Sequence, residues 1–181
     1  MGDVMVRDAR VADVARIGLV HVRSWQAAYR GLMPQDYLDG LDPEQRSDMW
    51  EHILAAQNPA RAGVLVVEAT EDEQQILGFV SYGTSRDDDA DKQKVGEVAA
   101  IYLLPDAWGK GAGGQLMGAA LGRLAGAGFA EATLWVLDTN VRARRFYQAG
   151  GWAPDGTVKT EDFRGFPLSE VRYRIALPGS A

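Results

Sequence analysis

The chain has 181 residues, of which 46% are hydrophobic and 24% are charged, and its formal net charge is −6. This length and composition predict one globular domain over residues 1–181 and exclude a disordered chain. An acidic chain is not typical of a general nucleic-acid binder, which needs a basic face. A chain without cysteine has no disulfide, no cysteine-ligated metal and no acyl-cysteine intermediate.

The chain shows no signal for membrane insertion or export. Its N-terminal residues soon carry charge, at Arg7, Asp8 and Arg10, and no later stretch approaches the roughly 20 apolar residues that a membrane span needs. We therefore expect a cytoplasmic protein with no membrane, nucleic-acid or metal partner.

The first half of the chain predicts, in order, a strand at 4–6, helices at 11–29, 34–41 and 43–56, and strands at 63–69 and 76–84. Val14, Ile17, His21 and Trp25 recur at a spacing of three or four residues, which places them on one face of the first long helix. A second apolar face on the same helix indicates that much of its surface is buried.

The second half begins with a polar, charged stretch at 85–94, which we expect to be a solvated hairpin loop without a special role. It continues with a strand at 95–104 that ends at Pro105, a helix at 113–127, a strand at 132–137, a helix capped by Asn140 that runs to 149, and strands at 152–159 and 170–177. The order predicts a mixed sheet with helices on its faces.

The turn from Trp108 to Gly114 follows a strand and opens a helix, and it has three interpretations. The first is an anion site, because glycines at such a junction let main-chain N–H groups and the helix dipole face an anion. A diphosphate is the natural ligand for such a site. Gly109, Gly111 and Gly114 also satisfy the dinucleotide-binding pattern G-x-G-x-x-G, but residues 105–108 separate them from the strand. The third interpretation is a flexible turn without a ligand.

Residues 97–105 (EVAAIYLLP) followed by 109–113 (GKGAG) resemble the acetyl-CoA signature of the GCN5-related N-acetyltransferase (GNAT) superfamily, Gln/Arg-x-x-Gly-x-Gly/Ala. Gly111 and Gly113 match its glycines, whereas Trp108 stands where glutamine or arginine is usual. Residues 140–147 (NVRARRFY), followed by Gly-Gly-Trp at 150–152, resemble the second part of the signature. The two parts come in the expected order, separated by one helix and one strand.

This resemblance implies an α/β (α+β) fold, the GNAT acyl-CoA N-acyltransferase fold, with a mixed, mostly antiparallel sheet of about seven strands flanked by four or five helices. It also implies that strand 95–104 carries a bulge and splays away from the next strand. The implied activity is transfer of the acetyl group of acetyl-CoA to a small-molecule or protein amine, by direct attack in a ternary complex. A homodimer is an expectation at the level of the family, and a non-catalytic coenzyme A sensor is the alternative function.

Carried over to this sequence, the resemblance makes Glu97 a general base, the Leu103 N–H an oxyanion donor and Tyr147 a general acid. The alternatives are a salt-bridged strand carboxylate for Glu97 and a packed aromatic pair for Tyr147. The first helix borders the acceptor pocket, with His21, Trp25 and Tyr29 as candidate pocket residues; His21 is either an alternative base or structural. The residues expected to contact the coenzyme are Ile101, Tyr102, Leu103, Trp108, Gly109, Lys110, Gly111, Ala112, Gly113, Gly114, Asn140, Arg145 and Phe146.

Overall fold

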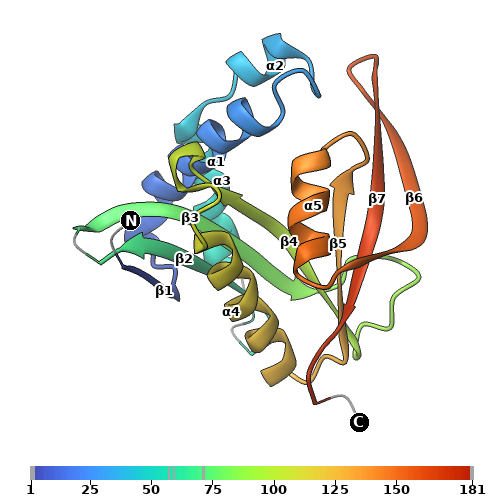
Figure 1. Cartoon of the computed structure of the whole chain (residues 1–181). Helices are drawn as coiled ribbons and strands as arrows, with labels where there is room; N and C mark the ends of the chain where they lie inside the picture. The colour runs from blue at the N-terminus through green and yellow to red at the C-terminus, as the bar shows by residue number, and fades with distance from the viewer. Residues whose placement is uncertain (1–2, 57, 59, 71, 180–181) are drawn as a thin grey trace.

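The computed structural model describes residues 3–56, 58, 60–70 and 72–179, and in them a seven-stranded sheet is flanked by five α-helices (Figure 1). The order across the sheet is β1-β2-β3-β4-β5-β7-β6, and every neighbouring pair is antiparallel except β4 and β5. The strands are β1 (Val4–Asp8), β2 (Gly63–Ala69), β3 (Asp72–Thr84), β4 (Val95–Leu103), β5 (Glu131–Leu137), β6 (Ala153–Phe163) and β7 (Phe166–Ala176). The helices are α1 (Val14–Ala28), α2 (Gln35–Asp39), α3 (Pro43–Ala56), α4 (Ala112–Gly126) and α5 (Val141–Ala149). This architecture confirms the predicted fold class.

The sheet is covered on both faces because successive side chains of a strand point to opposite sides. In β2, Val64 and Val66 pack against α1 and α3, whereas Leu65 and Val67 pack against α4. All four side chains are buried, which explains the continuous apolar sequence of this strand. Among the described residues, no helix has both the length and the apolar run that a bilayer crossing requires.

The sheet opens in its middle, between β4 and β5. These two parallel strands pair only from Val95 to Glu97, and beyond Glu97 they diverge, as Figure 1 shows. In the pairing of β4 with β3, Ser81 faces Ala100 but Tyr82 faces Val98, so Ala99 is the extra residue of a β-bulge. Both the bulge and the splay agree with the expectation from the family resemblance.

The β6–β7 hairpin is longer than predicted. The sequence predicts strands at 152–159 and 170–177, but β6 runs on to Phe163 and β7 begins at Phe166, on either side of a tight turn at Arg164 and Gly165. The sequence pattern misses this extension because β6 is an edge strand whose side chains are largely exposed, so apolar residues need not alternate along it. The hairpin tip packs on α2, with the Phe163 and Tyr37 rings 4.7 Å apart.

The polar loop at 85–94 is not simply solvated, which corrects its predicted role. Arg172 on β7 is only 4% exposed, and its guanidinium binds the carboxylates of Asp87 at 3.1 Å and Asp89 at 2.7 Å. It also binds Asp155 on β6 at 2.7 Å, and the Trp135 indole donates a hydrogen bond to Asp87 at 2.9 Å. The loop that precedes β4 is thereby fixed to the C-terminal strands.

Candidate active site

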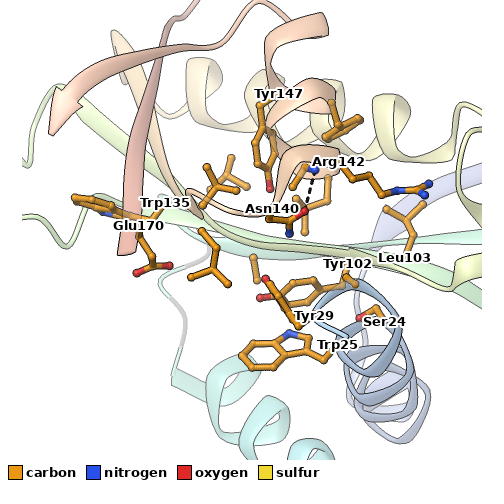
Figure 2. Close-up of a pocket in the computed structure, with 18 of the residues that line it drawn as sticks. Ser24, Trp25, Tyr29, Tyr102, Leu103, Trp135, Asn140, Arg142, Tyr147 and Glu170 are labelled. Carbon is orange, nitrogen blue, oxygen red and sulfur yellow. Dashed lines mark hydrogen bonds between the residues drawn. The ribbon is translucent and has the colours of Figure 1, made fainter. Parts of the chain in front are cut away.

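A cavity of about 800 Å³ opens where β4 and β5 diverge (Figure 2). Its walls come from residues 98–103 of β4, the glycine turn that follows, and α5 at one end. At the other end they come from α1, α2, β5 and the β6–β7 hairpin. The cavity therefore joins the two halves of the sequence signature to the first helices.

The glycine turn presents open main-chain groups at the N-terminus of α4. Gly109 and Gly111 have φ angles of 70° and 90°, a region that side chains other than glycine rarely adopt. Gly111 is the N-cap of α4 and no side chain caps this helix end, so its first N–H groups remain available to a ligand. A Cβ atom added at Gly109, Gly111 or Gly114 would meet no atom within 4 Å. The turn is thus an open cradle whose N–H groups and helix dipole favour an anion.

Trp108 connects this turn to β4. Its indole N–H donates to the main-chain oxygen of Leu103 at 2.9 Å, and the Arg142 guanidinium lies over its ring, 4.0 Å from the centroid. The tryptophan that departs from the family pattern therefore joins the turn, β4 and α5 in one contact. Arg142 brings a positive charge to this end of the cavity.

The free N–H groups of β4 point into the splayed region. Leu104 donates its N–H to Leu77 of β3 at 2.8 Å, and N–H groups of an antiparallel strand alternate between its two sides. The N–H groups of Leu103 and Ile101 therefore face away from β3, on the side where the Leu103 oxygen accepts from Trp108. Because β5 has already diverged, these groups are available to a carbonyl oxygen in the cavity.

Asn140 and Tyr147 form the α5 wall. The Asn140 side chain accepts from the Ala143 N–H at 3.1 Å, which confirms it as the N-cap of α5. Tyr147 is buried, and Figure 2 shows its hydroxyl pointing into the cavity toward Asn140. Burial raises the pKa of the Tyr147 phenol well above its ordinary value of 10, with a smaller contribution from Tyr102. The phenol therefore keeps its proton at neutral pH.

The opposite end of the cavity is aromatic and charged. Burial raises the pKa of Tyr29 and Tyr102, so both phenols are also protonated at neutral pH. The Lys159 ammonium lies over the Trp135 ring and 3.0 Å from a Glu170 oxygen. The remaining residues of this end include Trp25, Met33, Tyr37, Glu161, Phe163 and Leu168. Alternation along β6 and β7 places 159, 161 and 163 beside 168 and 170 on one face.

Glu97 lies on the cavity wall at the point where β4 leaves β5. Its carboxylate is nearly buried and accepts three hydrogen bonds from Arg86, one from the main-chain N–H at 2.9 Å and two from the guanidinium at 2.7 and 3.1 Å. The carboxylate is thus both salt-bridged and part of the cavity.

Most of the predicted site residues meet at this cavity, but four do not lie on its wall: His21, Lys110, Ala112 and Arg145. Ala112 packs in the core, and Arg145 lies on the exposed side of α5. Sequence reasoning missed Arg142, although residues four apart on a helix share a face and Arg142 is four before Phe146. It also missed the hairpin and β5 residues, since nothing in their local pattern indicates which face of the sheet the cavity occupies.

His21 lies behind the cavity in an aromatic cluster. Its ring stacks on Tyr102 at 5.2 Å, and its Nδ1 accepts a hydrogen bond from the Trp50 indole at 3.0 Å. Its Nε2 is buried and has no hydrogen-bond partner among the described residues. Burial, assisted by the charge of Arg46, lowers the pKa of His21 to about 3. The aromatic contacts and the lowered pKa indicate that His21 is neutral and has a structural role.

His21 should make the protein less stable in acid. Its folded-state pKa of about 3 lies below the ordinary 6.5, so only the unfolded chain takes up a proton between these values. The stabilisation is present above pH 6.5 and is lost as the pH falls toward 3, by about 2–3 kcal/mol between pH 7 and 4.5. His21→Asn keeps an acceptor for Trp50 but does not titrate. Between pH 7 and pH 4.5, its free energy of unfolding should therefore fall by about 2–3 kcal/mol less than that of the wild type.

Urea unfolding at pH 7 and pH 4.5 measures this difference. The chain has one other histidine, the exposed His52, so His52→Asn is the matched control and should keep the acid sensitivity of the wild type. Equal losses of stability in wild type and His21→Asn would contradict the assignment of His21 as a buried neutral side chain.

Known proteins share both the sequence pattern and the fold of this chain. A profile of the acetyltransferase (GNAT) family matches residues 23–152. The uncharacterised N-acetyltransferase YuaI of Bacillus subtilis is 32% identical over 169 residues, 93% of this chain and 90% of that protein. The solved structure of PaiA N-acetyltransferase from Thermoplasma acidophilum in complex with coenzyme A has 20% identity and a TM-score of 0.73, over 96% of this chain and 99% of that chain. YncA from Salmonella typhimurium, solved with acetyl-CoA, has 21% identity and a TM-score of 0.68, over 98% and 96%. The chain therefore belongs to the acetyltransferase (GNAT) family and is an acetyl-CoA-dependent N-acetyltransferase.

Proposed function

We propose that acetyl-CoA lies in the splayed region between β4 and β5, and that an amine enters from the aromatic end of the same cavity and attacks the acetyl group directly. The observation that carries this proposal is the meeting of three features in one cavity: the open glycine turn, the unpaired edge of β4 and the Tyr147 hydroxyl. The names of the relatives do not favour the alternative of a non-catalytic coenzyme A sensor.

The coenzyme end fits a diphosphate and an extended thiol arm. The N–H groups from Gly111 to Gly114 would hold the diphosphate, and Arg142 would add charge neutralisation at the same end. The N–H groups of Ile101 and Leu103 would bind the amide and thioester oxygens of the arm. Phe146 packs close to Gly113, where an added Cβ would lie 3.3 Å from its ring, so this glycine leaves room beside Phe146.

When bound, the coenzyme supplies an acetyl thioester, whose carbonyl carbon forms a bond to the amine nitrogen as its bond to sulfur breaks. Glu97, directly or through water, takes the proton that the amine must lose to attack. The Leu103 N–H stabilises the negative charge that develops on the carbonyl oxygen. Tyr147 donates a hydrogen bond to the departing sulfur and supplies its proton. The chain has no cysteine to carry an acyl group, in keeping with direct transfer.

The acceptor end favours a cationic amine. Glu97 and Glu170 are paired with Arg86 and Lys159, and Glu161 adds a third carboxylate, so carboxylates outnumber cations at this end. The aromatic rings beside them can also contact a cation. An alkylamine has a pKa near ~10 and arrives as an ammonium ion, which these carboxylates attract. The cytoplasmic location, the homodimer and the single domain over residues 1–181 stay predictions.

A panel of amines tests this function. The wild-type protein is incubated with acetyl-CoA and, in turn, an alkylamine, an aromatic amine, an amino acid and a lysine peptide, and the free thiol is followed. We expect at least one amine to raise thiol release well above the rate with acetyl-CoA alone. Binding of coenzyme A without added thiol release from any amine class would instead support the sensor.

A further inference from the structure

Arg86 and Glu97 form an ion pair between an exposed side chain and a buried one. The Arg86 side chain is 75% exposed, whereas that of Glu97 is 5% exposed. Within the described residues, the hydrogen bonds to the Glu97 carboxylate all come from Arg86, and the Arg86 guanidinium makes no hydrogen bond elsewhere. Withdrawal of this guanidinium would therefore cost little packing.

The main chain on both sides of Arg86 is held independently of that guanidinium. The Ser85 N–H donates to the Val95 oxygen at 3.0 Å, and Asp87 is bound by the Trp135 indole and by buried Arg172. If the side chain moves away, the Arg86 N–H can still donate to Glu97 at 2.9 Å. One oxygen of Glu97 then becomes free while the loop keeps its position.

An incoming ammonium ion and the guanidinium compete for the same carboxylate. Glu97 has about four acceptor directions, and Arg86 occupies three of them. Two cations at one carboxylate also repel each other. Both residues line the cavity and Arg86 is the more exposed of the two, so an amine that approaches Glu97 also meets Arg86.

We propose that Arg86 is a displaceable cap on Glu97, which the cationic acceptor amine replaces, so that Arg86 sets the affinity for the acceptor. This inference rests on the proposed function, in which Glu97 receives the amine. Arg86 is then a specificity-determining residue: it stands in for the acceptor's charge while the site is empty. It excludes weakly charged or poorly placed amines that cannot displace it.

Arg86→Ala should bind the acceptor more tightly. We expect the KM of the best amine in the panel to fall about two- to fivefold, the range that an exposed ion pair contributes. The KM for acetyl-CoA should stay within twofold of the wild type. Guanidinium chloride at about 20 mM should restore a higher amine KM in Arg86→Ala, beyond the effect of equal sodium chloride, and should have no such effect on the wild type.

Arg123→Ala is the matched control, because Arg123 is an exposed arginine paired with Asp8 at 2.8 Å and does not line the cavity. Its amine KM should equal that of the wild type. Calorimetric binding of the amine in the presence of coenzyme A gives a readout that needs no turnover, with n-butylamine as the probe if no amine is acetylated. An amine KM or Kd that is unchanged or weaker in Arg86→Ala would overturn the cap, whereas a failed amine panel alone would overturn only the proposed function.

Discussion

Replacement of Tyr147 with phenylalanine is expected to lower kcat about a hundredfold while coenzyme A still binds. The substitution removes one oxygen from a buried ring that packs against Trp152 and Tyr173, so the fold should persist. General acid catalysis typically contributes 10²–10⁴-fold, and a hundredfold loss corresponds to about 3 kcal/mol in the activation free energy. The effect should appear in kcat and leave the KM for acetyl-CoA within a few-fold.

The raised pKa of Tyr147 specifies how this phenol acts. An ordinary thiol has a pKa near ~8.5, below that of the buried phenol, so complete proton transfer to a solvated thiolate is uphill. The phenol therefore acts first by donating a hydrogen bond as charge develops on sulfur. Stopped-flow or steady-state assays of thiol release measure the loss in Tyr147→Phe.

Tyr82→Phe is the matched control for Tyr147→Phe. Tyr82 is a buried tyrosine of β3 that lies outside the cavity wall, so loss of its hydroxyl should leave kcat unchanged. A Tyr147→Phe variant with a kcat within twofold of the wild type would refute the acid role and leave Tyr147 as a packing residue.

Arg172→Met should destabilise the protein by about 3–5 kcal/mol. The substitution removes a buried cation from the carboxylates of Asp87 and Asp155. Arg174 still pairs with Asp155 at 3.1 Å, so Asp87 loses its cationic partner, and breaking a buried pair in this way carries a cost of this size. For a chain of this length, the corresponding fall in Tm is roughly 10 °C. Thermal unfolding by circular dichroism measures the change, and hydrogen exchange should become faster across residues 85–94.

A second substitution separates the charge effect from lost packing. Asp87→Asn keeps an acceptor for Trp135 and removes the charge that has lost its partner, so it should recover part of the stability in the Arg172→Met background. Arg123→Met removes an exposed pair and should change the free energy of unfolding by less than about 1 kcal/mol. If Arg172→Met and Arg123→Met lost equal stability, the buried network would not fix the loop.

The sequence predicted the elements that depend on local patterns. The helix that begins after Asn140 is confirmed because its cap and its apolar face are both encoded within ten residues. The strand before the glycine turn and the helix after it are also confirmed, with bounds that differ by one residue. These are the parts of the chain that carry the family signature.

The parts that the sequence did not predict depend on pairing between distant segments. The role of Arg172 requires β7 to lie beside the loop at 85–94, and no local pattern encodes a contact across more than 80 residues. His21 and Trp25 share one helical face, and the family resemblance makes both candidates for the acceptor pocket, with a structural role as the alternative for His21. His21 packs behind the wall that Trp25 forms, in keeping with that alternative. Residues on one helical face are therefore expected to be buried, but the pattern does not indicate which of them line a cavity.

A crystal structure with bound coenzyme A tests the central claim most directly. We predict that the diphosphate oxygens lie about 2.7–3.2 Å from main-chain nitrogens between Gly111 and Gly114, with the thiol arm along the free edge of β4. Electron density for the diphosphate elsewhere, with the N-terminus of α4 facing only solvent, would contradict the account.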